Sequence, residues 1–172
     1  MRQATFVLAT SIMVGASAVL PFAGPAEAGP AFNQRFEGIW VGAGTVKRDS
    51  DPDPRRVTCR VDGAADATRI ALDGTCRAML IFTRAIGANL AVDGSGTYSG
   101  VYTGSQVGPA RLSGTLDGDR IVLAVRFPEG VGGGRQEMTI ENPEGSDRFT
   151  LRVTDVIDGV PTEITNLVFE RR

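Results

Sequence analysis

Few side chains in this chain can do chemistry, and the sequence contains no histidine. Histidine is the usual general base near neutral pH and the commonest transition-metal ligand, so catalytic triads and histidine–metal sites are excluded. The two cysteines, Cys59 and Cys76, lack both the two-residue spacing and the additional ligands of a redox or metal pair. We therefore expect no metal and no cofactor, and no thiol nucleophile if the two cysteines are bridged.

A pair of carboxylates is the remaining way to build a hydrolase. Glu137 and Glu141 share one face of a predicted strand, but hydrophobic residues alternate with them, so both are expected on the solvent face. The glycines at 132–134 are not followed by the Lys-Ser/Thr of a phosphate-binding loop. The Asp-Gly-Asp at 117–119 is too short for a calcium loop, and a plain turn explains it. The sequence thus predicts a protein without catalytic activity.

Residues 1–28 have the features of a secretory signal peptide. Arg2 supplies a positive charge, Phe6–Leu20 is an uncharged and largely apolar run, and Ala26-Glu27-Ala28 places small residues at the −3 and −1 positions of a cleavage site. The apolar run is too short for an ordinary membrane span. We expect cleavage after Ala28 and a periplasmic or secreted protein without a transmembrane span. An uncleaved anchor or a core helix is the alternative interpretation.

Two cysteines in an exported chain favour a disulfide. Cys59 lies on the apolar side of a predicted strand at 57–61, and Cys76 on the apolar side of the next strand, at 70–76. Both side chains therefore face inward on consecutive strands, where a bridge between neighbours is plausible. Closing so short a loop stabilises a fold by about 3 kcal/mol in the chain-entropy model.

The chain is organised around residues 36–46, which contain the only tryptophan, Trp40. Gly38, Gly42 and Gly44 lie on the same side of the predicted strand as the indole. Three glycines on one face indicate a close approach of neighbouring backbone or a sharp bend, as at the corner of a small barrel. We interpret this stretch as the opening strand of a β-barrel, with Trp40 filling one end.

The rest of the chain reads as strands separated by turns rich in Asp, Gly and Pro. Residues 29–35 are expected to be a flexible lead-in, and no later segment has a convincing helical period. The pattern predicts an all-β protein, a single antiparallel up-and-down β-barrel of about 8–10 strands over residues 36–172, with a sandwich as the alternative. The strands after the first are predicted near 55–61, 68–77, 97–104, 110–116, 120–127, 135–141, 148–156 and 163–171. Between the second and third of these lie a continuous apolar run at 79–83 and a short one at 89–92.

The Gly38-Ile39-Trp40 in the first strand, followed by an antiparallel barrel, resembles the calycin superfamily of lipocalin- and avidin-type barrels. Residues 96–102, Gly-Thr-Tyr-Ser-Gly-Val-Tyr, also resemble avidin strands. Biotin binding is not implied, because avidins line their site with several tryptophans and this chain has one. The resemblance implies a barrel that binds a ligand.

A resemblance closer in pattern is to a set of uncharacterised exported bacterial proteins. They share the Phe-x-Gly-x-Trp-x-Gly-x-Gly opening seen at 36–44, the Val-x-Cys-Arg-Val strand seen at 57–61, and a second cysteine on the next strand, here Cys76. That family implies the fold and an exported location but no activity. Small periplasmic metalloprotease inhibitors are similar in combining an exported barrel, an early tryptophan and one disulfide, although they are markedly shorter.

Two groups of residues are candidates for binding. Trp40, Tyr98 and Tyr102 lie beside glycines, which could leave room for a ligand or sugar to stack on their rings; the alternative is that they fill a barrel end. The second group projects from the solvent face of the disulfide hairpin and could bind an anionic sugar, a lipid headgroup or an acidic protein. It consists of Arg56, Arg60, Arg69 and Arg77, with Asp62, Asp66 and Asp73 close enough to neutralise part of its charge.

Composition narrows the choice of partner. The formal net charge of −2 argues against a general nucleic-acid binder. We expect a non-catalytic barrel that binds a small molecule, a glycan or an envelope lipid at a barrel mouth near Trp40, with the arginine face as an accessory surface. The alternative is a protein-binding module, such as a periplasmic protease inhibitor, acting through a terminal segment or a loop.

Overall fold

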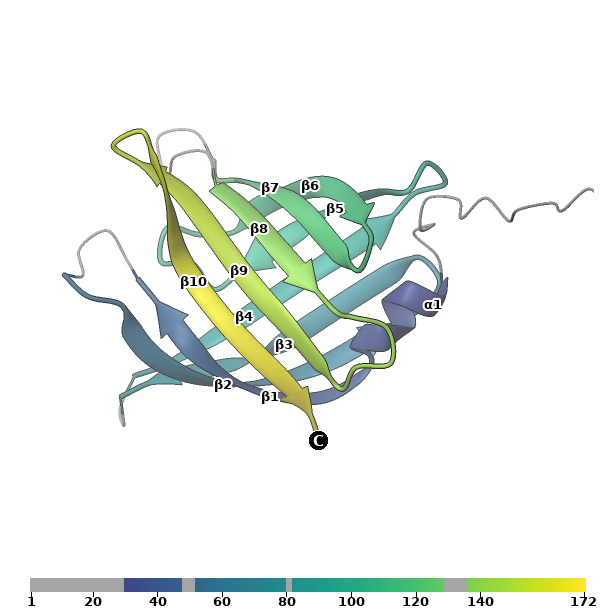
Figure 1. Cartoon of the computed structure of the whole chain (residues 1–172), viewed down its shortest axis with the longest axis horizontal. Coiled ribbons are helices and arrows are strands. Elements are labelled where there is room, and N and C mark those ends of the chain that lie inside the picture. The colour runs from purple at the N-terminus through teal and green to yellow at the C-terminus, as the bar shows by residue number, and fades with distance from the viewer. Residues whose placement is uncertain (1–29, 48–51, 80–81, 129–135) are drawn as a thin grey trace, which may run out of the picture.

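The computed structural model describes residues 30–47, 52–79, 82–128 and 136–172, which form a closed β-barrel (Figure 1). The predicted signal peptide at 1–28 lies outside the described residues. A short helix, α1 (Pro30–Asn33), and a 3-10 turn, η1 (Gln34–Phe36), precede the barrel. The strands are β1 (Gly38–Val46), β2 (Arg55–Ala65), β3 (Arg69–Ala78), β4 (Phe82–Val92), β5 (Thr97–Thr103), β6 (Ala110–Asp117), β7 (Arg120–Arg126), β8 (Gln136–Glu141), β9 (Arg148–Ile157) and β10 (Val160–Arg171).

The ten strands follow one another around the barrel in chain order. Each strand pairs antiparallel with the next, and β1 pairs with β10, which closes the sheet and leaves no free edge. The predicted single antiparallel up-and-down barrel is therefore confirmed, and the sandwich alternative is wrong. The sequence pattern succeeded here because apolar and polar residues alternate along the strands, as a sheet with one buried face requires.

The barrel interior is filled by the inward-facing residues of every strand. The inward-facing residues of β7 are buried: Ile121, Leu123 and Val125 are at most 4% exposed. Glu137, which alternates with buried Met138 on β8, is exposed, as expected. Among the described residues, no helix is long and apolar enough to cross a membrane.

The inward glycines stand where strands approach one another too closely for a side chain. A Cβ added at Gly44 would lie 1.9 Å from the carbonyl oxygen of Asn166 on β10, and one at Gly100 would lie 1.9 Å from that of Asn89 on β4. The predicted close approach of neighbouring backbone is confirmed at Gly44, whereas a Cβ at Gly42 would meet the ring of Phe169 and one at Gly38 the guanidinium of Arg171. These glycines allow the sheet to bend sharply enough to close.

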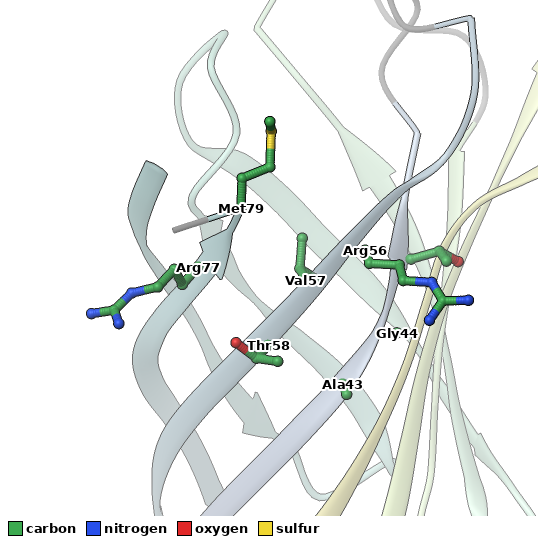
Figure 2. Close-up of a pocket in the computed structure, with 8 residues that line it drawn as sticks. Ala43, Gly44, Arg56, Val57, Thr58, Arg77 and Met79 are labelled. Atoms are coloured by element: carbon green, nitrogen blue, oxygen red, sulfur yellow. The ribbon is translucent and has the colours of Figure 1, made fainter. Parts of the chain in front are cut away.

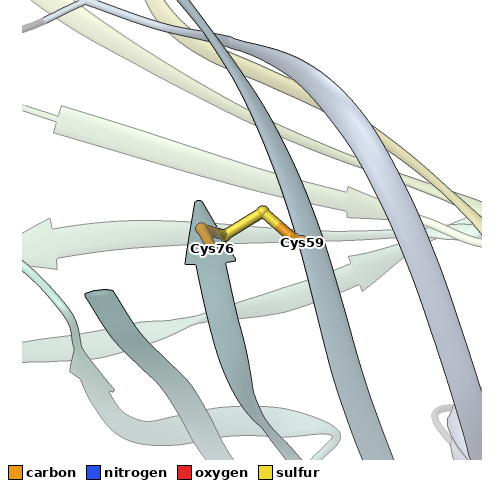
Figure 3. The surroundings of a disulfide bond; sticks show 2 residues. All are labelled: Cys59 and Cys76. Atoms are coloured by element: carbon orange, nitrogen blue, oxygen red, sulfur yellow. A yellow bond between two sulfur atoms is a disulfide. The ribbon is translucent and has the colours of Figure 1, made fainter. Parts of the chain in front are cut away.

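The predicted disulfide is confirmed. Cys59 on β2 stands directly opposite Cys76 on β3, and the two sulfur atoms are bonded across the inner face of the barrel (Figure 3). The bridge therefore links two strands that are already neighbours in the sheet.

Two local predictions are wrong. Residues 30–35, expected to be part of a flexible lead-in, belong to α1 and η1, where Phe32 and Phe36 are buried in the core. The apolar run expected at 79–83 is not one element: Met79 lies in a turn, and β4 begins at Phe82 and runs without a break to Val92, with residues 80 and 81 outside the described residues. Met79 has a φ of 52° and is exposed, because it lies in the turn that leaves β3.

Candidate functional site

The segment formed by α1 and η1 closes one end of the barrel, which we call the capped end (Figure 1). Arg35 fastens it there: one guanidinium nitrogen donates hydrogen bonds to Asp119 Oδ1 at 2.6 Å and to the carbonyl of Asn142 at 3.0 Å. In return, Nδ2 of Asn142 donates to the carbonyl of Arg35 at 3.1 Å. Two inter-strand turns, β6–β7 and β8–β9, thus hold the cap.

Trp40 lies beneath this cap and is fully buried. Its indole Nε1 donates a 2.9 Å hydrogen bond to the carbonyl of Phe36, and its ring packs edge-on against Phe149 at 4.8 Å between centroids. The guanidinium of Arg171 lies 4.3 Å from the Trp40 ring centroid. The prediction that Trp40 fills a barrel end is confirmed, whereas the mouth expected beside it is covered by the cap.

Tyr98 is also at the capped end and fully buried. Its hydroxyl donates a 2.7 Å hydrogen bond to Oδ1 of Asn33, which holds α1 against β5. Burial raises the pKa of Tyr98 to about 12. Of the three aromatic residues proposed to bind a ligand, Trp40 and Tyr98 therefore stabilise the cap, and Tyr102 does not share their surroundings.

At the opposite end, which we call the far end, inward-facing side chains are partly exposed. Arg84 stands opposite Cys76 in the β3–β4 pairing, so it shares the inner face with the disulfide. One step nearer the rim, Phe82 stands opposite Ala78 and is 57% exposed. The far end is formed by the strand ends at Val46, Arg55, Ala78, Phe82, Thr103, Ala110, Arg126, Gln136, Ile157 and Val160.

Tyr102 faces inward between the capped and far ends, opposite Ala88 on β4 and buried Ala110 on β6. It is half-buried. Burial raises the pKa of Tyr102, and the positive charge of Arg84 acts in the opposite direction. Tyr102 is therefore the one predicted aromatic residue that borders the far end.

The barrel wall opposite β4, formed by β8 and β9, contains the polar pair Gln136 and Asp155. Asp155 is only 5% exposed, and Nε2 of Gln136 donates a 2.8 Å hydrogen bond to its Oδ2. The backbone N–H of Val156 donates to Oδ1 at 2.7 Å. The strand order places β9 five strands away from β4, so this carboxylate and Arg84 belong to opposite walls.

The predicted arginine surface lies on the outer face of β2 and β3. Thr58 stands opposite Arg77, with Arg56 and Arg60 two residues to either side, so three of the four arginines lie around one threonine. Arg69 is at the other end of β3 and apart from them. Figure 2 shows Arg56 and Arg77 on either side of Thr58. These three residues contribute to the lining of a hollow of about 580 Å³.

This outer surface has the chemistry of an anion site. Within the part of the chain that the structure describes, the side chains of these four arginines have no hydrogen bond and no ion pair. Asp62 and Asp73 face each other across β2 and β3, which leaves both carboxylates on the same outer face as the arginines. The role of the surface in anion binding stays a prediction.

Sequence reasoning missed Arg84. The signal was present, because Arg84, Ile86, Ala88, Leu90 and Val92 alternate with polar or small residues, as a strand with one buried face requires. The alternation was not recognised because the segment was treated as two separate apolar runs, at 79–83 and 89–92.

Comparison with known proteins identifies a fold. No family model matches the chain, and no curated protein matches it. The crystal structure of Rv2717c from M. tuberculosis is similar, with a TM-score of 0.62 and 16% sequence identity over 80% of this chain and 93% of that chain. At this identity the similarity shows a shared barrel architecture and nothing about ligand or activity.

Proposed function

We propose that this protein is a non-catalytic binding barrel that takes up a small molecule with an apolar part through the far end. The observation that carries the proposal is the exposure of inward-facing apolar residues there: Phe82 is 57% exposed, and Ile86 and Phe127 are half-buried. Inward-facing apolar side chains that remain in contact with water are suited to binding the apolar part of a ligand. The resemblance to calycin barrels supports the same proposal.

We place this activity outside the cytoplasm. The signal-peptide pattern of residues 1–28 supports export, and the Cys59–Cys76 disulfide is the kind of bond that persists in an oxidising compartment. Envelope lipids, glycans and other small molecules of that compartment are therefore the ligands to be searched.

The experiment uses N-phenyl-1-naphthylamine, an uncharged fluorophore that brightens in apolar surroundings. We expect a saturable rise in its fluorescence and a weaker affinity for Phe82→Ser, since Phe82 lies at the rim. Val101→Ser is the matched control, because Val101 is 41% exposed but alternates with inward Tyr102 and so lies on the outer wall. No saturable rise, or equal weakening by the two substitutions, would contradict the proposal.

The second candidate function is a protein-binding module, which the β9–β10 hairpin favours. Its tip exposes Val156 and Val160, at 43% and 61%, on either side of a turn in which Asp158 has a φ of 52° (Figure 1). Val160 pairs with Ile157 and Val156 with Pro161, so the tip exposes one valine on each face of the hairpin. Exposed apolar residues of this kind are suited to contact with a partner protein. Inhibition of secreted metalloproteases that Val160→Asp abolishes would support this candidate, and an unaffected protease panel would count against it.

A further inference from the structure

We infer that the ligand of the far end is an amphipathic anion whose acidic group pairs with Arg84 and accepts a hydrogen bond from Tyr102. This inference rests on the proposed function and adds the chemical class of the ligand. It would be a carboxylate, sulfonate or phosphate attached to an apolar body.

The first argument is the position of Arg84. Cross-strand partners lie on the same face of a sheet, and Arg84 is the partner of Cys76, whose disulfide to Cys59 crosses the inner face. Residues at intervals of two on β4 lead from Arg84 to Ala88 and Leu90, both buried in the core. Arg84 is therefore an inward-facing arginine, one step below the rim.

The second argument is that Arg84 has no anion of its own. Within the described chain it makes no ion pair and no hydrogen bond. Among the described strand residues, Asp155 is the only inward-facing carboxylate, and it belongs to the opposite wall, where Gln136 and the N–H of Val156 bind its oxygens. Arg84 is exposed, so its guanidinium is accessible to an anion that enters from the far end.

The third argument is the neighbouring phenol. The hydroxyl of Tyr102 has no hydrogen-bond partner among the described residues and is not sealed in the core. Tyr102 stands opposite Ala88, which is two inward positions from Arg84 on β4, so the phenol and the guanidinium lie on the same inner wall. The charge of Arg84 opposes the effect of burial on the pKa of Tyr102. A guanidinium and a phenol O–H together offer a planar pair of N–H donors and one further donor to a single acidic group.

The fourth argument is the distribution of charge and apolar surface around the pair. Ile86 and Phe82 adjoin Arg84 on the inner face of β4 and could contact the apolar body of the ligand. Asp155 would repel an acidic group, so the head of the ligand is directed to the β4–β5 wall. The site would thus bind the acidic group of an amphipathic anion at Arg84 and its apolar body at Ile86 and Phe82.

The test compares two probes that differ only in charge. 8-Anilino-1-naphthalenesulfonate has the skeleton of N-phenyl-1-naphthylamine plus a sulfonate, so the ratio of the two dissociation constants isolates the contribution of the anion. We expect the sulfonate to bind at least tenfold more tightly than the neutral probe. Arg84→Gln should remove this preference, so that the sulfonate and the neutral probe bind with similar affinity, and Tyr102→Phe should reduce the preference by a smaller factor.

Arg111→Gln is the matched control. Arg111 lies between buried Ala110 and Leu112 on β6, so it faces outward, and its substitution makes the same change in net charge. A near-UV circular dichroism spectrum like that of the wild type verifies that each variant is folded. A second pair, dodecanoate against dodecanol as competitors of the neutral probe, should show the same dependence on Arg84.

The outcomes separate this inference from the proposed function. If neither probe binds saturably, the proposed function fails and the inference fails with it. If both probes bind with equal affinity, or if Arg84→Gln does not alter the sulfonate's advantage, the binding barrel stands and the anionic ligand is overturned. Equal losses in Arg84→Gln and Arg111→Gln would also overturn it, because they would show attraction to the overall charge.

Discussion

The hydroxyl of Tyr98 donates a 2.7 Å hydrogen bond to Oδ1 of Asn33, and both side chains are fully buried. Nδ2 of Asn33 in turn donates to the carbonyl of Ala67 at 3.2 Å. One asparagine therefore connects α1 to β5 and to the turn between β2 and β3. The cap is held to the barrel by specific hydrogen bonds as well as by the burial of Phe32 and Phe36.

Replacing Asn33 by Ala is expected to lower the free energy of unfolding by about 1–3 kcal/mol, because the buried hydroxyl of Tyr98 loses its acceptor. Urea denaturation followed by Trp40 fluorescence measures the change, since the indole lies under the same cap. Gln34→Ala, at an exposed position of the same segment, should be nearly neutral. Equal effects of the two substitutions would contradict a specific role for the Tyr98–Asn33 bond.

Stability should fall as the pH rises from 10 to 12. Burial raises the pKa of Tyr98 from 10.0 to about 12, so the folded state retains a proton that the unfolded state loses. The resulting stabilisation is complete below pH 10 and is lost as the pH passes through the folded-state pKa, by about 2 kcal/mol at pH 12. Urea midpoints measured across this range, with phenolate absorbance at 295 nm, test the expectation.

Tyr98→Phe is the control for this pH dependence. The variant loses the bond to Asn33 and is less stable at neutral pH, but its stability should decline less steeply above pH 10. Tyr102, whose pKa burial also raises, accounts for the remaining slope. An unchanged slope would mean that Tyr98 does not control alkaline unfolding.

The disulfide should matter for stability and not for the formation of the barrel. Cys59 and Cys76 are already cross-strand partners, so reduction removes a constraint on the unfolded chain and leaves the β2–β3 pairing in place. The Cys59→Ala, Cys76→Ala double variant should be less stable by about 3 kcal/mol. Far-UV circular dichroism of the variant at low temperature should be unchanged; a loss of strand signal there would contradict this prediction.

The sequence predicted the barrel well because its evidence is local and periodic. The alternation around Cys59 and along Ile121–Val125 determines which face is buried, and inward glycines such as Gly44 report the bends that closure requires. The pairing of β1 with β10 joins strands from the two ends of the domain, so no local pattern contains it. It still follows from the alternation of apolar and polar residues, because a sheet of ten hairpin-linked strands buries its apolar face by closing into a barrel.

The cap and the candidate site could not be predicted in the same way. α1 is four residues long, which is too short for a helical period, and its place is decided by distant partners such as Ala67 and Asp119. Trp40 and Tyr102 have the same local pattern of an aromatic residue beside glycines, but one is under the cap and the other borders the far end. Which end of a barrel is covered depends on contacts that no local pattern contains.

The glycines of the inner face provide the last prediction. A Cβ at Gly100 would lie 1.9 Å from the carbonyl oxygen of Asn89 and 3.0 Å from Cα of Leu90, and both atoms belong to the backbone of β4. No rotamer change relieves such a contact, so the β4–β5 pairing must shift, and Gly100→Ala should cost about 1–3 kcal/mol. Gly94→Ala has no atom within 4 Å of the new Cβ and should be neutral or slightly stabilising, because alanine restricts the unfolded chain.

Urea denaturation of the two variants tests the difference. If Gly100→Ala were as stable as Gly94→Ala, backbone approach would not be the reason for a glycine at this position.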